Sequence, residues 1–216
     1  TVNGARTGAS GHLGDHYPQI WKPVIGAING WHNWMKVGEL TAVILFLLIC
    51  FSFIALIVAF AFSDFSVRLV VQHSHSLKPL IYKIAGTWGN HEGSMLLWIF
   101  ILALYGSLIA FLGKRIPLLL KARVLCVQAV ILSAFTAFLL FTSNPFIRVM
   151  DPPIDGNGLN PILQDPGLAF HPPFLYLGYV GLSVTFSFAL AALMQGNIDS
   201  SWARWVRPWT LSSWIF

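Results

Sequence analysis

Long apolar segments alternate with short polar ones along most of the chain. Residues 40–62, 93–112, 124–141 and 174–194 carry no charged side chain. About 20 mainly apolar residues form a helix that crosses a bilayer, and a helix satisfies its own backbone polar groups there. The pattern therefore predicts an all-α integral membrane protein with four transmembrane helices and external loops. Residues 208–216 begin a further apolar segment that is too short to span, and they are predicted to be the start of a fifth helix.

The N-terminal residues differ in kind from the rest. Residues 1–36 are rich in glycine, hold no apolar run and show no signal-peptide pattern. We interpret them as a polar segment on the cytoplasmic or matrix side, and residues 37–216 as a transmembrane domain. Because the first residue is not Met and the fifth helix is short, we expect the sequence to be part of a longer protein or one piece of a split gene product.

Composition and charge agree with a membrane location. Of the 216 residues, 56% are apolar and 10% are charged, against about 45–50% and about 25% in soluble domains. The net charge is +5, and the basic residues are distributed unequally between the loops on the two sides. One side of the predicted bundle carries Arg6, Lys22, Lys36, Lys114, Arg115, Lys121, Arg123, Arg204 and Arg207, and the other carries Arg68, Lys78, Lys83 and Arg148. The first side is predicted to face the cytoplasm or matrix. This sorting excludes a nucleic-acid surface, which would group the basic residues on one soluble face.

The cysteines and histidines limit the chemistry of this chain. Cys50 and Cys126 lie at different depths in separate helices, so we predict no disulfide between them. None of the seven histidines lies in the middle of a predicted span. This chain alone therefore offers no histidine pair to a haem inside the membrane. Four histidines are predicted on the outer side, namely His73, His75, His91 and His171.

The first polar segment of interest directly precedes the second span. Residues 87–94 read TWGNHEGS, and the His91-Glu92 pair lacks the second histidine of a zinc-protease H-E-x-x-H helix. Two interpretations stay open. The segment is either a polar helix start, with Glu92 near the positive end of the helix dipole, or a polar cluster that lines an outer pocket.

The second segment directly precedes the fourth span. Pro172 and Pro173 suit the first turn of a helix, where no amide donor is needed. The residue before a proline is pushed out of helical geometry, so His171 is predicted to cap the outer mouth of this helix. The helix dipole there disfavours the imidazolium, and a neutral imidazole is what an iron ligand requires. The alternative is an interfacial histidine that hydrogen-bonds the backbone.

Several contiguous strings resemble one family. Residues 88–98 read WGNHEGSMLLW, which resembles the W-G-x-H-E-G-S-x-L-L-W signature of CcmF-type cytochrome c haem lyases. Further similar strings are residues 141–146, 155–160, 163–167, 170–173, 176–181, 207–210 and 214–216. The chain departs from the family at its start, where members usually have one more helix before position 40. The family's WWD segment and its remaining haem-binding histidines would lie beyond residue 216.

The resemblance implies a function and a set of partners. CcmF-type proteins receive haem from the chaperone CcmE and attach its vinyl groups to the two cysteines of an apocytochrome c C-x-x-C-H. CcmH/CcmI-type subunits present the apocytochrome, and the rest of the lyase completes the site. His171 falls on the family's first external haem ligand. The implied haem-binding residues are His171, Pro172, Pro173, Trp88, Gly89, His91, Glu92 and Gly93. The setting would be the bacterial or mitochondrial inner membrane, with the haem on the periplasmic or intermembrane side. The alternative is a structural or assembly subunit that binds no haem.

Overall fold

A computed structural model describes residues 32–196 and 200–216, so expectations about residues 1–31 lie outside the described part. In chain order the helices are α3 (His32–Ala61), α4 (Arg68–His73), α5 (Leu80–Gly86), α6 (His91–Leu112), α7 (Leu118–Thr142), α8 (Pro166–Gln195) and α9 (Ser200–Ile215). Two 3₁₀ turns, η1 (Gly113–Arg115) and η2 (Pro161–Leu163), complete them. The described residues contain no named strand, and one isolated bridge joins Val67 to Arg148. The all-α prediction is confirmed.

Four helices are long and apolar enough to cross a membrane. They comprise Met35–Ala61, His91–Arg115, Leu118–Thr142 and Ala169–Gln195, which confirms the four predicted spans. Each helix is longer than its charge-free segment because further residues continue it at one or both ends. The fifth apolar segment is the second half of α9. The helix that carries it already begins at Ser200, and Pro208 lies inside it.

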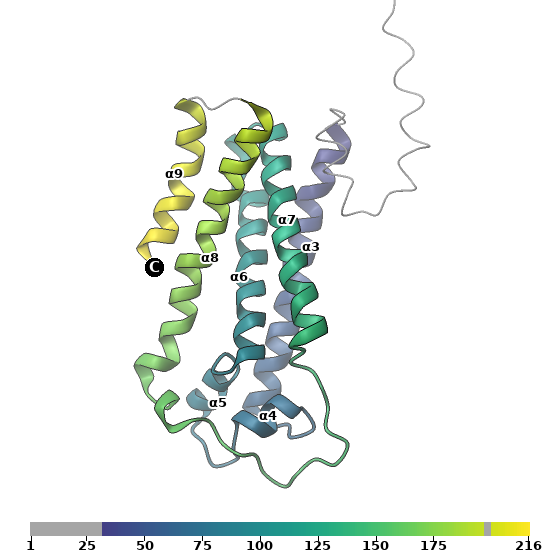
Figure 1. The fold of residues 1–216 in the computed structure, drawn as a ribbon, viewed down its shortest axis with the longest axis vertical. Helices are drawn as coiled ribbons and strands as arrows, with labels where there is room; N and C mark the ends of the chain where they lie inside the picture. The colour runs from purple at the N-terminus through teal and green to yellow at the C-terminus, as the bar shows by residue number, and fades with distance from the viewer. Residues whose placement is uncertain (1–31, 197–199) are drawn as a thin grey trace, which may run out of the picture.

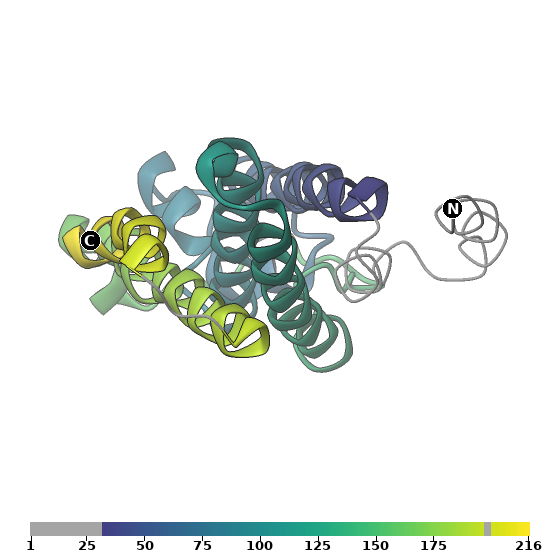
Figure 2. The same ribbon diagram turned by 90° about the horizontal axis from the view of Figure 1, so that it is seen from above.

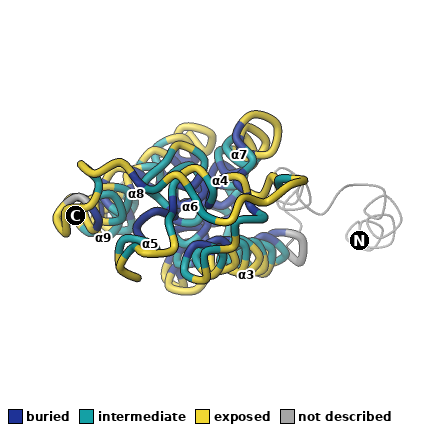
Figure 3. The backbone as a smooth tube through the Cα atoms, turned by 90° about the horizontal axis from the view of Figure 1, so that it is seen from below, coloured by how far each residue is buried: buried dark blue, intermediate teal, exposed yellow. Residues whose placement is uncertain are grey.

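α6 forms the centre of the bundle. It packs against α3, α7 and α8, and α9 packs along one half of α8 (Figure 1). The view from above shows α6 enclosed by the other long helices (Figure 2). In the most apolar part of α6, 61% of the residues are buried, against 17% in α3. Figure 3 agrees with this difference, because α3 is mostly intermediate or exposed and has few buried residues.

The two ends of the bundle differ. α4, α5 and the connection between α7 and α8 gather at the lower end in Figure 1, which we call the outer end. η1 lies at the opposite end, which carries Lys114, Arg115 and Lys121 and which we call the basic end. The chain thus brings the two predicted outer segments, near Trp88 and near His171, to the same end.

Polar side chains join the helices inside the bundle. The Tyr105 hydroxyl donates to the Leu177 carbonyl over 2.8 Å and so links α6 to α8. The Gln128 amide donates to the hydroxyls of Ser183 and Ser187 at 3.1 and 3.0 Å and links α7 to α8. Cys50 and Cys126 are both free, as predicted.

Candidate functional site at the outer end

The start of α6 is fixed by an asparagine cap. The Asn90 side-chain oxygen accepts from the Gly93 amide at 2.7 Å, and its NH₂ group donates to the Gly86 carbonyl at 2.7 Å. One side chain therefore closes the first turn of α6 and ties it to the end of α5. The sequence reasoning missed Asn90, although an asparagine directly before an apolar helix is an N-cap signal.

Two other residues of this segment also have a local role. A Cβ on Gly93 would collide with the backbone carbonyl of Thr87, which cannot move aside as a flexible side chain could. Glu92 lies in the first turn of α6, where its charge favours the helix dipole, as one of the two interpretations expected. Part of the segment is therefore required simply to make the sharp turn from α5 into α6.

His91 faces α7. Its Nε2 lies 3.0 Å from the Ser143 hydroxyl. Its ring is edge-on to Phe138, with the ring centroids 6.4 Å apart. These two contacts hold the imidazole on the side of α6 that faces the end of α7.

The predicted start of the fourth span is wrong. α8 begins at Pro166, so His171 is not a helix cap but lies inside the helix, together with Pro172 and Pro173. The rule that proline suits the first turn does hold, but it acts at Pro166. The Ala169 amide donates to the Asp165 carbonyl at 2.9 Å, which closes the first turn there.

The two predicted segments meet across a cavity. The Trp88 indole Nε1 donates to the Ala169 carbonyl in α8 over 2.8 Å. A cavity of about 380 Å³ lies beside this bond. Its lining includes Trp88, Gly89 and Pro172, together with Tyr176. Within residues 87–94, the side that lines the cavity comprises Trp88, Gly89, Asn90 and Ser94. The other predicted site residues, namely His91, Glu92, Gly93, His171 and Pro173, are not among the residues that line it.

His171 differs from the other three outer histidines. It is exposed, and within the described residues no hydrogen bond or ion pair engages its imidazole. His73 Nδ1 lies 3.2 Å from the Leu69 carbonyl. His75 Nδ1 accepts from the Leu77 amide at 3.2 Å and lies 3.5 Å from the Asp155 carboxylate. His91 contacts Ser143, as described above. Of the four, His171 is the one whose ring is uncommitted in the described part of the chain.

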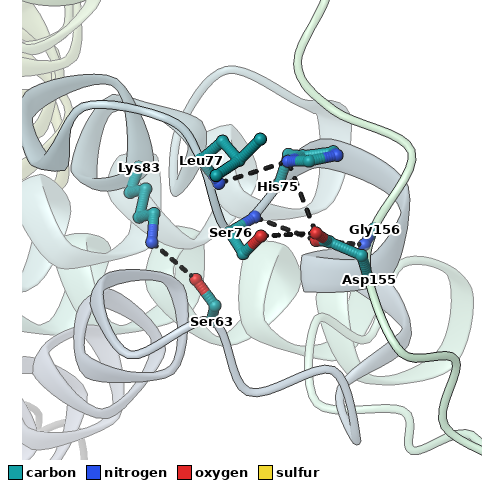
Figure 4. Close-up of polar contacts among 7 residues, drawn as sticks. All are labelled: Ser63, His75, Ser76, Leu77, Lys83, Asp155 and Gly156. Atoms are coloured by element: carbon teal, nitrogen blue, oxygen red, sulfur yellow. Dashed lines mark hydrogen bonds and ion pairs between the residues drawn. The ribbon is translucent and has the colours of Figure 1, made fainter.

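A polar cluster joins the two loops at the outer end (Figure 4). Asp155 accepts from the Ser76 amide at 2.9 Å, from the Ser76 hydroxyl and from the Gly156 amide at 2.8 Å. These bonds, the Ser76 hydroxyl foremost, lower the pKa of Asp155 to about 2. Because the Ser76 hydroxyl donates to Asp155 and not to His75, this Ser-His-Asp group is not arranged as an activated nucleophile. We call it the Asp155 clasp.

The pKa of Lys78, a lysine near the Asp155 clasp, is lower than that of an ordinary lysine. Burial, aided by the nearby charge of Lys83, lowers the pKa of Lys78 to about 8. The Lys78 ammonium donates to the His73 carbonyl at 3.3 Å, and Lys83 donates to the Ser63 hydroxyl at 2.8 Å. Both amines are therefore used to hold the loops of the outer end.

The described residues form no cage for a metal ion. Among the described residues, no three His, Cys, Asp or Glu side chains come together as a metal-ion cage. A single uncommitted imidazole, such as that of His171, instead suits an iron that already holds four equatorial nitrogens and needs an axial ligand, as in haem.

Comparisons with known proteins identify relatives of this chain. The family model described as "Cytochrome C assembly protein" matches residues 88–216, which is more than half of the chain. The chain is 59% identical over 194 residues to the cytochrome c-type biogenesis protein ccl1 of Rhodobacter capsulatus, covering 90% of this chain and 30% of that protein. It is 47% identical over 195 residues to the cytochrome c-type biogenesis protein CcmF of Escherichia coli, again over 90% of this chain and 30% of that protein.

A solved structure shows the same architecture. The fold is similar to that of a cytochrome c haem lyase CcmF with a TM-score of 0.76 and 26% identity, covering 91% of this chain and 31% of that chain. The chain thus spans about 30% of the length of the relatives it matches. Because the family model matches more than half of the chain, including His171 and three of the four spans, the chain belongs to the cytochrome c assembly protein family.

Proposed function

We propose that this chain forms part of a cytochrome c haem lyase and supplies His171 as an axial ligand to haem at the outer end of the bundle. The observation that carries the proposal is the state of His171, which is exposed on a spanning helix and uncommitted within the described residues. Phe170 and Phe174 flank it with 52% and 54% of their surface exposed, one residue before it and three after it. Their apolar rings suit the flat face of haem.

Haem is the substrate in this proposal. Its vinyl groups supply the carbons that become thioethers with the two cysteines of the C-x-x-C-H of apocytochrome c. This chain's part is to hold and orient the haem through His171, beside the cavity between Trp88 and Pro172. Haem would come from the chaperone CcmE, CcmH/CcmI-type subunits would present the apocytochrome, and the additional length found in the relatives would complete the site.

We further propose that the outer end faces the periplasm of bacteria or the intermembrane space of mitochondria, across the inner membrane. Supporting this orientation, Lys114, Arg115 and Lys121 lie at the basic end, and basic residues are retained on the cytoplasmic or matrix side of membrane proteins.

The test replaces His171 in the full-length protein. We expect His171→Ala to insert normally and to lose stable haem capture, measured as haem per protein in a pyridine haemochrome assay. His75→Ala is the matched control, because it removes an imidazole at the same end that already has two partners. Normal haem content and normal cytochrome c maturation in His171→Ala would refute the proposal.

A further inference from the structure

Two consecutive prolines interrupt the hydrogen-bond ladder of α8 near its outer mouth. In an α-helix the amide four residues on donates to each carbonyl, and in 3₁₀ geometry the amide three residues on does so. For the carbonyl of Ala169 these positions are Pro173 and Pro172, and proline has no N–H. The Ala169 carbonyl therefore cannot find either partner in its own helix.

The missing bond is supplied from outside the helix. Ala169 is 3% exposed, so water has little access to its backbone. An unpaired buried carbonyl costs free energy comparable to a lost hydrogen bond. The Trp88 indole donates to this carbonyl at 2.8 Å and takes the place of the two absent amides. Trp88 itself is held two residues from the Asn90 cap, in the tight turn between α5 and α6.

A second tryptophan bonded to α8 provides the contrast. Trp202 Nε1 donates to the Phe188 carbonyl at 3.2 Å. The residues three and four positions beyond Phe188 are Ala191 and Ala192, both of which carry an amide N–H. The bond from Trp202 is therefore an addition to the ladder, whereas the bond from Trp88 replaces a part that the ladder lacks.

We propose that Trp88 is a positioning residue for His171, acting through the Ala169 carbonyl. Pro172 and Pro173 remove the ladder bonds that their amides would make to the carbonyls of residues 168 and 169, and the indole anchors this weakened part of α8 to the start of α6. His171 lies in this part of α8, two residues beyond Ala169. The bond thereby holds the helix around His171 in one orientation. The link to haem rests on the proposed function, whereas the effect on α8 does not.

The first test measures the helix without haem. Ala169→Cys places a small thiol at a buried position of the full-length protein, and the same protein without this substitution gives the background from Cys50 and Cys126. We expect Trp88→Phe to raise the rate of labelling by a maleimide about tenfold, because opening this part of α8 no longer breaks the indole bond. Trp202→Phe is the matched control and is expected to leave the rate unchanged.

The second test uses a rescue. Pro173→Ala restores an amide four residues beyond Ala169, so the Ala169 carbonyl regains a partner within its own helix. We expect Trp88→Phe to weaken haem retention about tenfold in the original protein. In a background that already carries Pro173→Ala, we expect Trp88→Phe to cause no further loss. Haem retention is read from the absorption spectrum during titration with a competing haem-binding protein. A variant that loses haem because it misfolds would not be rescued by Pro173→Ala.

Each outcome decides the proposal. Faster labelling in Trp88→Phe, reversed by Pro173→Ala, supports it. Unchanged labelling in Trp88→Phe overturns it. A loss of haem retention in Trp88→Phe that Pro173→Ala does not reverse also overturns it, and would indicate that the Trp88 ring itself contacts haem. If His171→Ala keeps its haem while the labelling results hold, the proposed function fails and the anchoring of α8 by Trp88 stands.

Discussion

An ion pair near the basic end joins the most exposed long helix to the bundle. Lys121 Nζ of α7 lies 2.6 Å from Glu39 Oε1 of α3. The Lys121 side chain is 8% exposed and that of Glu39 is 32% exposed. The pair therefore links α3 to α7 in addition to the apolar packing between these helices. The perturbation we consider is Glu39→Ala, which leaves the Lys121 ammonium without its partner.

The cost of Glu39→Ala can be worked from the geometry. At 2.6 Å and an effective dielectric constant of about 20, the attraction between the two charges is about 6 kcal/mol. Desolvation of the two groups offsets much of this attraction. Removing one partner of a buried pair typically costs about 3–5 kcal/mol, because the other charge stays buried and unpaired. Since Glu39 is one-third exposed and water can partly replace it, we expect a loss at the lower end, about 3 kcal/mol.

Replacing both groups separates this cost from a general loss of packing. Glu39→Leu combined with Lys121→Met removes both charges and keeps apolar volume, so we expect it to lie within about 1 kcal/mol of the original protein. The assay is reversible unfolding of the purified protein in mixed micelles, followed by loss of helical circular dichroism as denaturing detergent is added. Equal stability of Glu39→Ala and the original protein, or a double variant as unstable as Glu39→Ala, would refute the reasoning.

Two further predictions concern the outer end and α6. Gly93→Ala should destabilise the protein by about 3 kcal/mol, because its Cβ meets the Thr87 carbonyl, whereas Gly106→Ala, with open space around its Cβ, should stabilise it by about 0.5–1 kcal/mol in the same unfolding assay. Asp155→Asn should raise the proteolysis rate of the outer loops at neutral pH and abolish its acid dependence. The pKa of Asp155 falls from 3.8 to about 2 on folding, so the clasp is fully present well above pH 3.8 and is lost as pH falls through about 2. Proteolysis that is unchanged by the substitution would contradict the role of the clasp.

The spans were predictable because the bilayer sets their length and hydropathy. Three of the four charge-free segments lie entirely within a helix of the structure, and the first extends one residue past the end of α3. The start of α8 was not predictable from the local sequence. Reading the proline rule at Pro172 required the helix to begin there, but the Ala169 carbonyl obtains its donor from Trp88, about 80 positions earlier in the sequence. A tertiary hydrogen bond of this kind leaves no local pattern.

The candidate site was likewise predictable only in part. The sequence identified both segments that meet at the cavity, and it placed them on the same side of the membrane. It could not tell which histidine is uncommitted, because this depends on partners distant in the chain, such as Ser143 for His91 and Asp155 for His75. The sequence left open whether residues 87–94 start a helix or line a pocket, and the structure shows both, since Gly93 shapes the turn into α6 and Asn90 caps that helix and lines the cavity.

α8 is hydrogen-bonded to α6 and to the residue before it at two points along its length. These two bonds explain how an exposed histidine can be kept in place on a helix that contains two prolines. Near the outer mouth, the Trp88 indole just before α6 donates to Ala169. Further along, the Tyr105 hydroxyl of α6 donates to Leu177, and Gly181 makes room for that ring because a Cβ there would lie 2.6 Å from the hydroxyl. A helix that accepts hydrogen bonds from neighbouring side chains on both sides of its prolines has little freedom to change its orientation. Ligation by His171 would therefore carry a smaller ordering cost than ligation from a loop, and this favours a helix-borne histidine where a bulky substrate must be held and then released.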